Sequence, residues 1–225
     1  MMRIEEFDKL FPEQILNRDI QAEEDVSAAV DENLAEVRRR GDAALREYTR
    51  RFNGADLTDL AVSPEEIKAA WSALDGDFRT TLELAAENIR RFHEQQVHRN
   101  FVLTDRPGMV LGQRYTPIEK VGVCVPSSPV AFPSTILMSV IPAKIAGVRE
   151  IVLVTPPDET GAISPTALAA AKIAGADRIF KLGGAQAVAA LAYGTESVPR
   201  VDKIVGPGNI FVATAKRKVF GRVAI

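Results

Sequence analysis

Two glycine-rich loops are the strongest candidates for a ligand-binding site in this sequence: Gly183-Gly184-Ala185-Gln186 and Gly206-Pro207-Gly208-Asn209. Each follows a short apolar run and opens a helix-forming segment, so each should lie at the carboxyl end of a parallel strand, where open α/β sheets bind ligands. Glycine permits close backbone approach, and the free amides of a helix N-terminus attract phosphate. The pattern favours a small anionic ligand. The same residues would also make tight turns, and Asn209 could equally cap its own helix.

Other reactive side chains are few. His93 and His98 are the only histidines, and they lie five positions apart, whereas a metal pair on one helical face would be spaced three or four apart. Cys124 is the single cysteine, which excludes an intrachain disulfide or a cysteine cluster and fits a reducing compartment. A nucleophilic thiol needs an adjacent base, and no histidine lies near Cys124 in the sequence. We assign no metal ligand and no catalytic residue to this chain.

The two loops must be positioned by a repeating pattern of strands and helices that begins at Val121. The expected strands are Val121–Val125, Glu150–Val154, Arg178–Leu182, Lys203–Val205 and a short one at Val223–Ile225. The expected helices between them are Ser134–Ala146, Pro165–Ala174, Ala185–Tyr193 and Asn209–Phe220, closed by Gly147, Gly175, Gly194 and Gly221. Repeated β-α units predict an α/β fold with a parallel sheet and helices on its faces. The strand order is not readable from the sequence.

The first 120 residues indicate a mainly helical region. Apolar residues at helical spacing predict helices over Glu23–Arg40, Asp42–Phe52 and Phe78–Gln96, and a capping box starts another at Ser63. Two strands, Val110–Tyr115 and Val121–Val125, should follow, joined by a turn at Thr116-Pro117. We therefore divide the chain into residues 1–125, a helical region with the start of a first α/β domain, and residues 126–225, a second α/β lobe; the family resemblance described below implies that both domains are Rossmann-like and the first incomplete.

Composition narrows the class of protein. The 225 residues are 46% hydrophobic with a net charge of −2, enough to bury a core. Residues 1–120 hold 17 basic against 24 acidic residues, whereas residues 121–225 hold 11 against 6. The small excess of basic residues in the second half is too sparse for a nucleic-acid surface. The longest apolar-rich run, Ile136–Val148, is too short and too interrupted for a membrane span, and the N-terminus does not resemble a signal peptide. We expect a soluble cytoplasmic protein.

Several segments of the sequence resemble those of the histidinol dehydrogenase family. They are Gly183 to Glu196, Val201 to Asn209, Pro133 to Met138 with Ile141 to Val148, and Arg50-Arg51-Phe52-Asn53-Gly54. The resemblance implies incomplete Rossmann-like domains in a cytoplasmic, zinc-containing homodimer. It also implies the closing reaction of histidine biosynthesis, in which L-histidinol is oxidised to L-histidine through the aldehyde in two NAD-dependent steps.

Carried over residue by residue, the resemblance places Gln186 and Asn209 at positions that contact NAD. A third such position, a tyrosine in the family, falls on Cys124. Where the family usually has Tyr-x-Pro-Gly-Gly, this sequence has Cys124-Val125-Pro126-Ser127-Ser128, which removes an aromatic surface and restricts the backbone.

The family's zinc ligands and its Glu-His acid/base pair lie in segments that would follow Ile225, so we expect no catalytic and no metal-binding residue in this chain and no activity from it alone. Two alternatives stay open. One is a paralogous NAD-dependent dehydrogenase of another small alcohol, and the other is a truncated, non-catalytic module for nucleotide binding or assembly.

Overall fold

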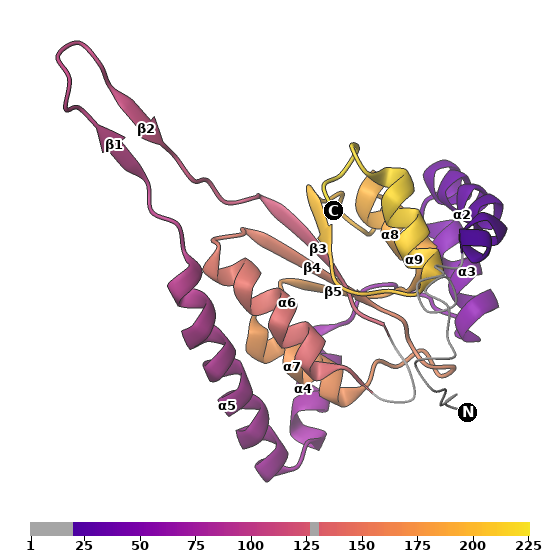
Figure 1. The fold of residues 1–225 in the computed structure, drawn as a ribbon. Coiled ribbons are helices and arrows are strands. Elements are labelled where there is room, and N and C mark those ends of the chain that lie inside the picture. The colour runs from indigo at the N-terminus through magenta and orange to yellow at the C-terminus, as the bar shows by residue number, and fades with distance from the viewer. Residues whose placement is uncertain (1–19, 127–130) are drawn as a thin grey trace, which may run out of the picture.

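The computed structural model describes residues 20–126 and 131–225 (Figure 1). The helices are α2 (Ile20–Arg40), α3 (Asp42–Asn53), α4 (Pro64–Ala73), α5 (Gly76–His93), α6 (Pro133–Ile145), α7 (Pro165–Ala174), α8 (Gly184–Tyr193) and α9 (Ile210–Val219), with a 3-10 turn, η2 (Glu94–Gln96). The strands are β1 (Phe101–Leu103), β2 (Leu111–Gln113), β3 (Lys120–Cys124), β4 (Glu150–Thr155), β5 (Arg178–Lys181) and β6 (Lys203–Val205). Within the described residues, no helix combines the length and apolarity that crossing a membrane requires.

The centre of the fold is a parallel four-stranded sheet in the order β5-β4-β3-β6. Val121 of β3 lies opposite both Ile151 of β4 and Lys203 of β6, so β3 is an inner strand. The chain builds outward from β3 through β4 to β5 and then crosses back to add β6 on the other side of β3. The parallel α/β sheet expected from the sequence is confirmed, and the structure supplies the strand order that the sequence left open.

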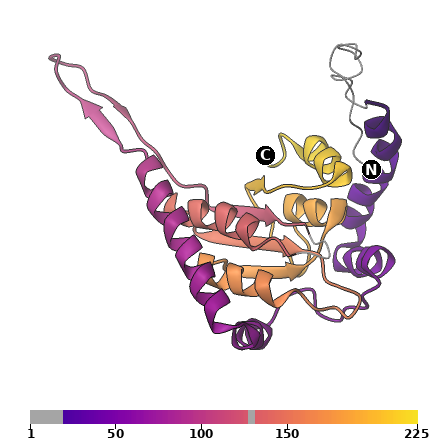
Figure 2. The same cartoon turned by 60° about the horizontal axis from the view of Figure 1, so that its bottom comes forward.

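Helices cover both faces of this sheet, as Figures 1 and 2 show. Alternate residues of β4 point to opposite faces: Ile151 and Leu153 join one buried cluster, and Val152 and Val154 join the other. The first cluster includes α6 and α7, with α4 and α5 packed outside them; the second includes α8 and α9, with α2 and α3 outside. The helices α2 to α5 therefore form the outer layers on both faces of the sheet.

Several local expectations hold. Ser63 and Glu66 form the predicted capping box, with Glu66 N donating to Ser63 Oγ over 3.1 Å and Ser63 N donating to Glu66 Oε2 over 2.8 Å. The four glycines expected after helices, Gly147, Gly175, Gly194 and Gly221, all have φ between 78° and 89°. A positive φ is least strained at glycine, which suits these positions after the helices.

The strands around residue 110 were predicted in part incorrectly. Residues 111–113 do form a strand, but β2 pairs antiparallel with β1, which the sequence did not reveal, and not with β3. The two strands form a hairpin that projects from the body (Figures 1 and 2). All six of their residues are exposed, so no alternation of buried and exposed positions marks them in the sequence.

The short strand expected at Val223–Ile225 does not form. Residues 223–225 make only isolated bridges, one of them between Ala224 and Lys203.

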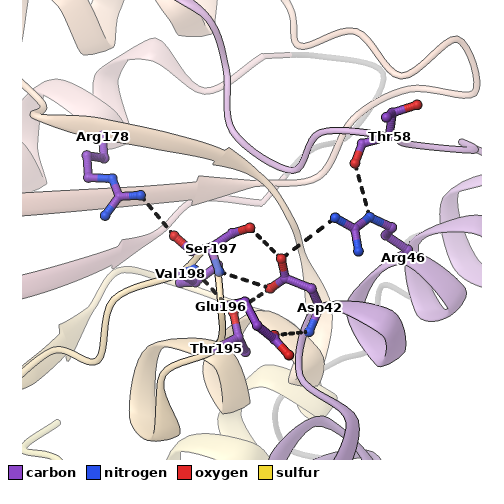
Figure 3. A network of polar contacts seen from close by, with 8 residues as sticks. All are labelled: Asp42, Arg46, Thr58, Arg178, Thr195, Glu196, Ser197 and Val198. Atoms are coloured by element: carbon purple, nitrogen blue, oxygen red, sulfur yellow. Dashed lines mark hydrogen bonds and ion pairs between the residues drawn. The ribbon is translucent and has the colours of Figure 1, made fainter.

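A polar network fastens the start of α3 to the loop that follows α8 (Figure 3). The Asp42 carboxylate accepts hydrogen bonds from Thr195 Oγ1 at 2.7 Å, from Ser197 N at 3.3 Å and from the Ser197 hydroxyl. Glu196 Oε2 accepts the Asp42 backbone N–H at 2.8 Å, and Arg46 lies 3.7 Å from Asp42 Oδ2. The network therefore joins residues about 150 positions apart and holds α3 against the lobe that carries the glycine loops.

Candidate ligand site at the edge of the sheet

The strand order creates a crevice between β3 and β6. The chain turns to opposite sides of the sheet after these two neighbouring strands, because α6 follows β3 on one face and α9 follows β6 on the other. Open α/β sheets bind ligands at such a switch point, beyond the carboxyl ends of the strands. The loop Gly206-Pro207-Gly208-Asn209 lies at this position, and Cys124 ends the neighbouring strand.

Gly206 brings the ends of β3 and β6 together. Its φ of +97° is a conformation that favours glycine, and a Cβ built on it would lie 2.0 Å from the Cys124 carbonyl oxygen. The carbonyl of Gly206 accepts a hydrogen bond from Lys216 Nζ, on the following helix α9. There is no room for a side chain at Gly206, so glycine is needed here for close packing as well as for the turn.

A cavity of about 220 Å³ occupies this crevice. Its lining includes Cys124, Pro126, Gly183, Gly208 and Asn209. Asn209 is the N-cap of α9, and its Oδ1 accepts the Val212 backbone N–H at 3.2 Å. Asn209 therefore caps its own helix, which was one of the two roles considered from the sequence. Capping uses Oδ1, so the amide nitrogen of Asn209 can still donate to a ligand.

A second cavity of about 390 Å³ adjoins the first, and both are lined by Pro156, Gly183, Gly184 and Asn209. Gln186, in the first turn of α8, lines the second cavity and is 2% exposed. The three residues selected from the sequence thus surround two adjoining cavities, with Cys124 in one, Gln186 in the other and Asn209 in both. Ser127 and Ser128, the family's glycine positions, lie outside the described residues.

Cys124 is a buried thiol with little nucleophilic character. Burial raises its pKa to about 11, and the opposing effect of the Lys216 ammonium is smaller. Its side chain belongs to the apolar cluster that contains Val154 and Leu191. Since the thiolate is the reactive form of cysteine, this environment argues against the nucleophile role considered from the sequence.

We expect Cys124 in the native chain to react at pH 8 with iodoacetamide at least roughly 100-fold more slowly than in the urea-unfolded chain, because the raised pKa depletes the thiolate and packing blocks access. Mass spectrometry of timed samples measures both rates, and a small free thiol in each solvent corrects for the effect of urea. Equal corrected rates would show that the thiol is exposed.

The sequence did not single out four further residues that line the larger cavity: Asn33 on α2, Phe52 and Asn53 at the end of α3, and Phe211 on α9. Phe52 and Asn53 belong to the string Arg50 to Gly54 that resembles the family, so a signal for them existed. Asn33 lies directly before Leu34 on the buried stripe that includes Val30. A polar residue on an apolar helix face was the signal that could have identified it.

The two histidines lie elsewhere, at the base of the projecting hairpin. His93 Nδ1 is 2.6 Å from Gln96 Oε1, and the His98 ring stacks on Tyr115 with 4.8 Å between ring centroids. Among the described residues, no three His, Cys, Asp or Glu side chains group closely enough to hold a metal ion. The described side chains therefore do not fit a zinc site.

The fold and the crevice define an α/β protein whose parallel sheet has two adjoining cavities at its switch point. Residues 16–225 match the protein family described as histidinol dehydrogenase. The chain belongs to the histidinol dehydrogenase family, as its sequence motifs indicated.

Individual relatives agree with this assignment. The chain is 55% identical to a histidinol dehydrogenase of Syntrophotalea carbinolica over 90% of its own length and 47% of that protein. It is 53% identical to one from Lactiplantibacillus plantarum over 89% of this chain and 46% of that protein. The crystal structure of histidinol dehydrogenase from Elizabethkingia anophelis superposes with a TM-score of 0.86 at 37% identity, covering 88% of this chain and 46% of that one. The chain thus spans about half the length of these relatives.

Proposed function

We propose that this chain provides the NAD-binding lobe of an NAD-dependent, zinc-containing histidinol dehydrogenase, which oxidises L-histidinol to L-histidine through the aldehyde. The observation that carries this proposal is the pair of cavities at the switch point, where Gln186 and Asn209 meet two glycine loops. Family membership supplies the substrate, the zinc, the cytoplasmic location and the homodimer as parts of the same proposal. The zinc ligands and the acid/base pair are assigned to residues that this chain does not contain.

The crevice suits a dinucleotide in three respects. Backbone N–H groups at the start of α9 favour a phosphate, and Gly208, just before that helix, is exposed. The ammonium of Lys216 adds positive charge beside Gly206. Gln186 and Asn209 place neutral amides where hydrogen bonds can orient the rest of the ligand. NAD, when bound, supplies the hydride acceptor; this chain's residues hold and orient it.

The proposal is tested by titrating NAD into the purified chain by calorimetry, together with two variants. Gln186→Leu keeps the side-chain volume and removes the amide, whereas Asn209→Ser removes the amide nitrogen but keeps an oxygen that can cap α9. We expect each variant to bind NAD roughly five- to tenfold more weakly, since a neutral hydrogen bond contributes about 1 kcal/mol.

Circular dichroism and urea unfolding of both variants serve as the folding controls. No binding by the unmutated chain would contradict the proposal and would favour an assembly module without nucleotide binding. Equal affinity in all three proteins would show that NAD, if bound, lies elsewhere.

A further inference from the structure

One buried amide oxygen at the larger cavity, Asn33 Oδ1, lacks a hydrogen-bond partner among the described residues. Asn33 is 6% exposed, and its side chain lines the same cavity as Gln186 and Asn53. A buried polar atom left unpaired costs its full desolvation, so the native chain carries an acceptor that a bound ligand could satisfy.

The walls of this cavity favour an uncharged, flat group. Among the described residues, its lining contains no Lys, Arg, Asp, Glu or His. Amide side chains reach it from α2, from the end of α3 and from α8, and the partly exposed rings of Phe52 and Phe211 lie at its edge. Its volume of about 390 Å³ falls within the range of small-molecule sites. Amides and aromatic rings together are suited to a planar heterocycle that carries N–H donors.

The adjoining cavity has a different character. It lies at the N-terminus of α9, and Lys216 is bonded to the carbonyl of Gly206 beside it. This side suits the phosphates, and the Asn33 side suits a base. Because Gly183, Gly184 and Asn209 line both cavities, one ligand can extend from the first into the second.

We propose that Asn33 is a ligand-binding residue whose side-chain oxygen accepts a hydrogen bond from an N–H of a neutral, planar heterocycle held in the larger cavity. This inference rests on the proposed function, since the heterocycle is one end of the dinucleotide. The amino group of an aminopurine has the required chemistry. The carboxamide of the nicotinamide ring offers the same donor, but that ring is a pyridinium cation in oxidised NAD, so the uncharged walls favour the aminopurine.

The test compares the 225-residue chain with Asn33→Leu, a variant of similar side-chain size without polar atoms. Calorimetry gives the affinity of each protein for NAD, for adenosine monophosphate and for nicotinamide mononucleotide, and urea unfolding gives the midpoint of each. We expect Asn33→Leu to bind NAD at least roughly tenfold more weakly, because its site loses one hydrogen bond and gains an unpaired ligand N–H. Its urea midpoint should be equal or higher, since an unpaired buried oxygen has been removed.

The two mononucleotides identify the source of the heterocycle, because only the one whose ring occupies the larger cavity should lose affinity in Asn33→Leu. If the unmutated chain and Asn33→Leu bind NAD equally, the proposed function stands and the role of Asn33 is overturned. A lower urea midpoint with unchanged affinity would make Asn33 purely structural and would also overturn it. If the unmutated chain binds none of the three ligands, both proposals fall.

Discussion

Gly206→Ala should destabilise the chain by about 3–5 kcal/mol, the combined cost of a strained φ and of overpacking. The new Cβ would lie 2.0 Å from the Cys124 carbonyl oxygen, which is backbone of the central strand and cannot rotate away. The ends of β3 and β6 would have to separate, and the crevice would open with them. Urea unfolding followed by circular dichroism measures the change in the free energy of unfolding.

Gly221→Ala is the matched control for this substitution. Gly221 has a similar φ of +89°, but a Cβ there would meet no atom within 4 Å. It should therefore cost only the backbone strain, about 1–2 kcal/mol. If both variants lose the same stability, the contact between Gly206 and Cys124 does not constrain the fold.

Asp42→Ala should lower the free energy of unfolding by about 2–3 kcal/mol, since hydrogen bonds to a charged group contribute about 1.5–3 kcal/mol. The variant removes the acceptor shared by Thr195 and Ser197 and leaves the backbone N–H of residue 42, bonded to Glu196, to hold the start of α3 to the loop after α8 (Figure 3). Urea unfolding at pH 7 measures the loss. Asp56→Ala is the control, because Asp56 forms an exposed ion pair with Arg50 that should contribute at most about 1 kcal/mol.

The contribution of Asp42 should also depend on pH. Burial opposes ionisation of this carboxyl, but the hydrogen bonds from Ser197 and Thr195 outweigh it, and the pKa of Asp42 in the folded chain lies below its ordinary value of 3.8. The stabilisation is therefore complete above the unfolded pKa and is lost as the pH falls through the lower folded pKa. The difference in the free energy of unfolding between the unmutated chain and Asp42→Asn should therefore shrink as the pH falls below about 4. A difference that stays constant with pH would assign the effect to packing and not to charge.

Much of the fold could be predicted because it follows from local signals. Pro165–Ala174 and Lys203–Val205 were predicted with the bounds that the structure has, since proline, glycine and short apolar runs mark their ends. Strand order depends on contacts between distant segments and has no local signal. The strand β1 was missed because its residues are all exposed, so no apolar periodicity distinguishes it. The division at residue 125 stays a prediction.

The candidate site was predicted on one side only. Glycine loops after strands identified the carboxyl edge of the sheet, and the family resemblance selected Gln186, Asn209 and Cys124, whose contacts with NAD stay predictions. The opposite wall, which includes Asn33, comes from a helix more than 150 positions earlier in the sequence. The place of Asn33 on an apolar helix face marks it in the sequence, but only the packing of α2 against α8 and α9 shows that it belongs to this site.

The pairing of β3 with β6 has a consequence for how the chain folds. Lys120 donates its backbone N–H to Asp202, 82 positions later, and Asp42 donates to Glu196, 154 positions later. Contacts that close such long loops are slow to form, whereas β3, β4 and β5 are neighbours in the chain as well as in the sheet. The three strands β3, β4 and β5 should therefore pair early, with β6 and α2 joining afterwards. The two cavities are then the last part of the molecule to be assembled, and ligand binding during refolding would report the final step.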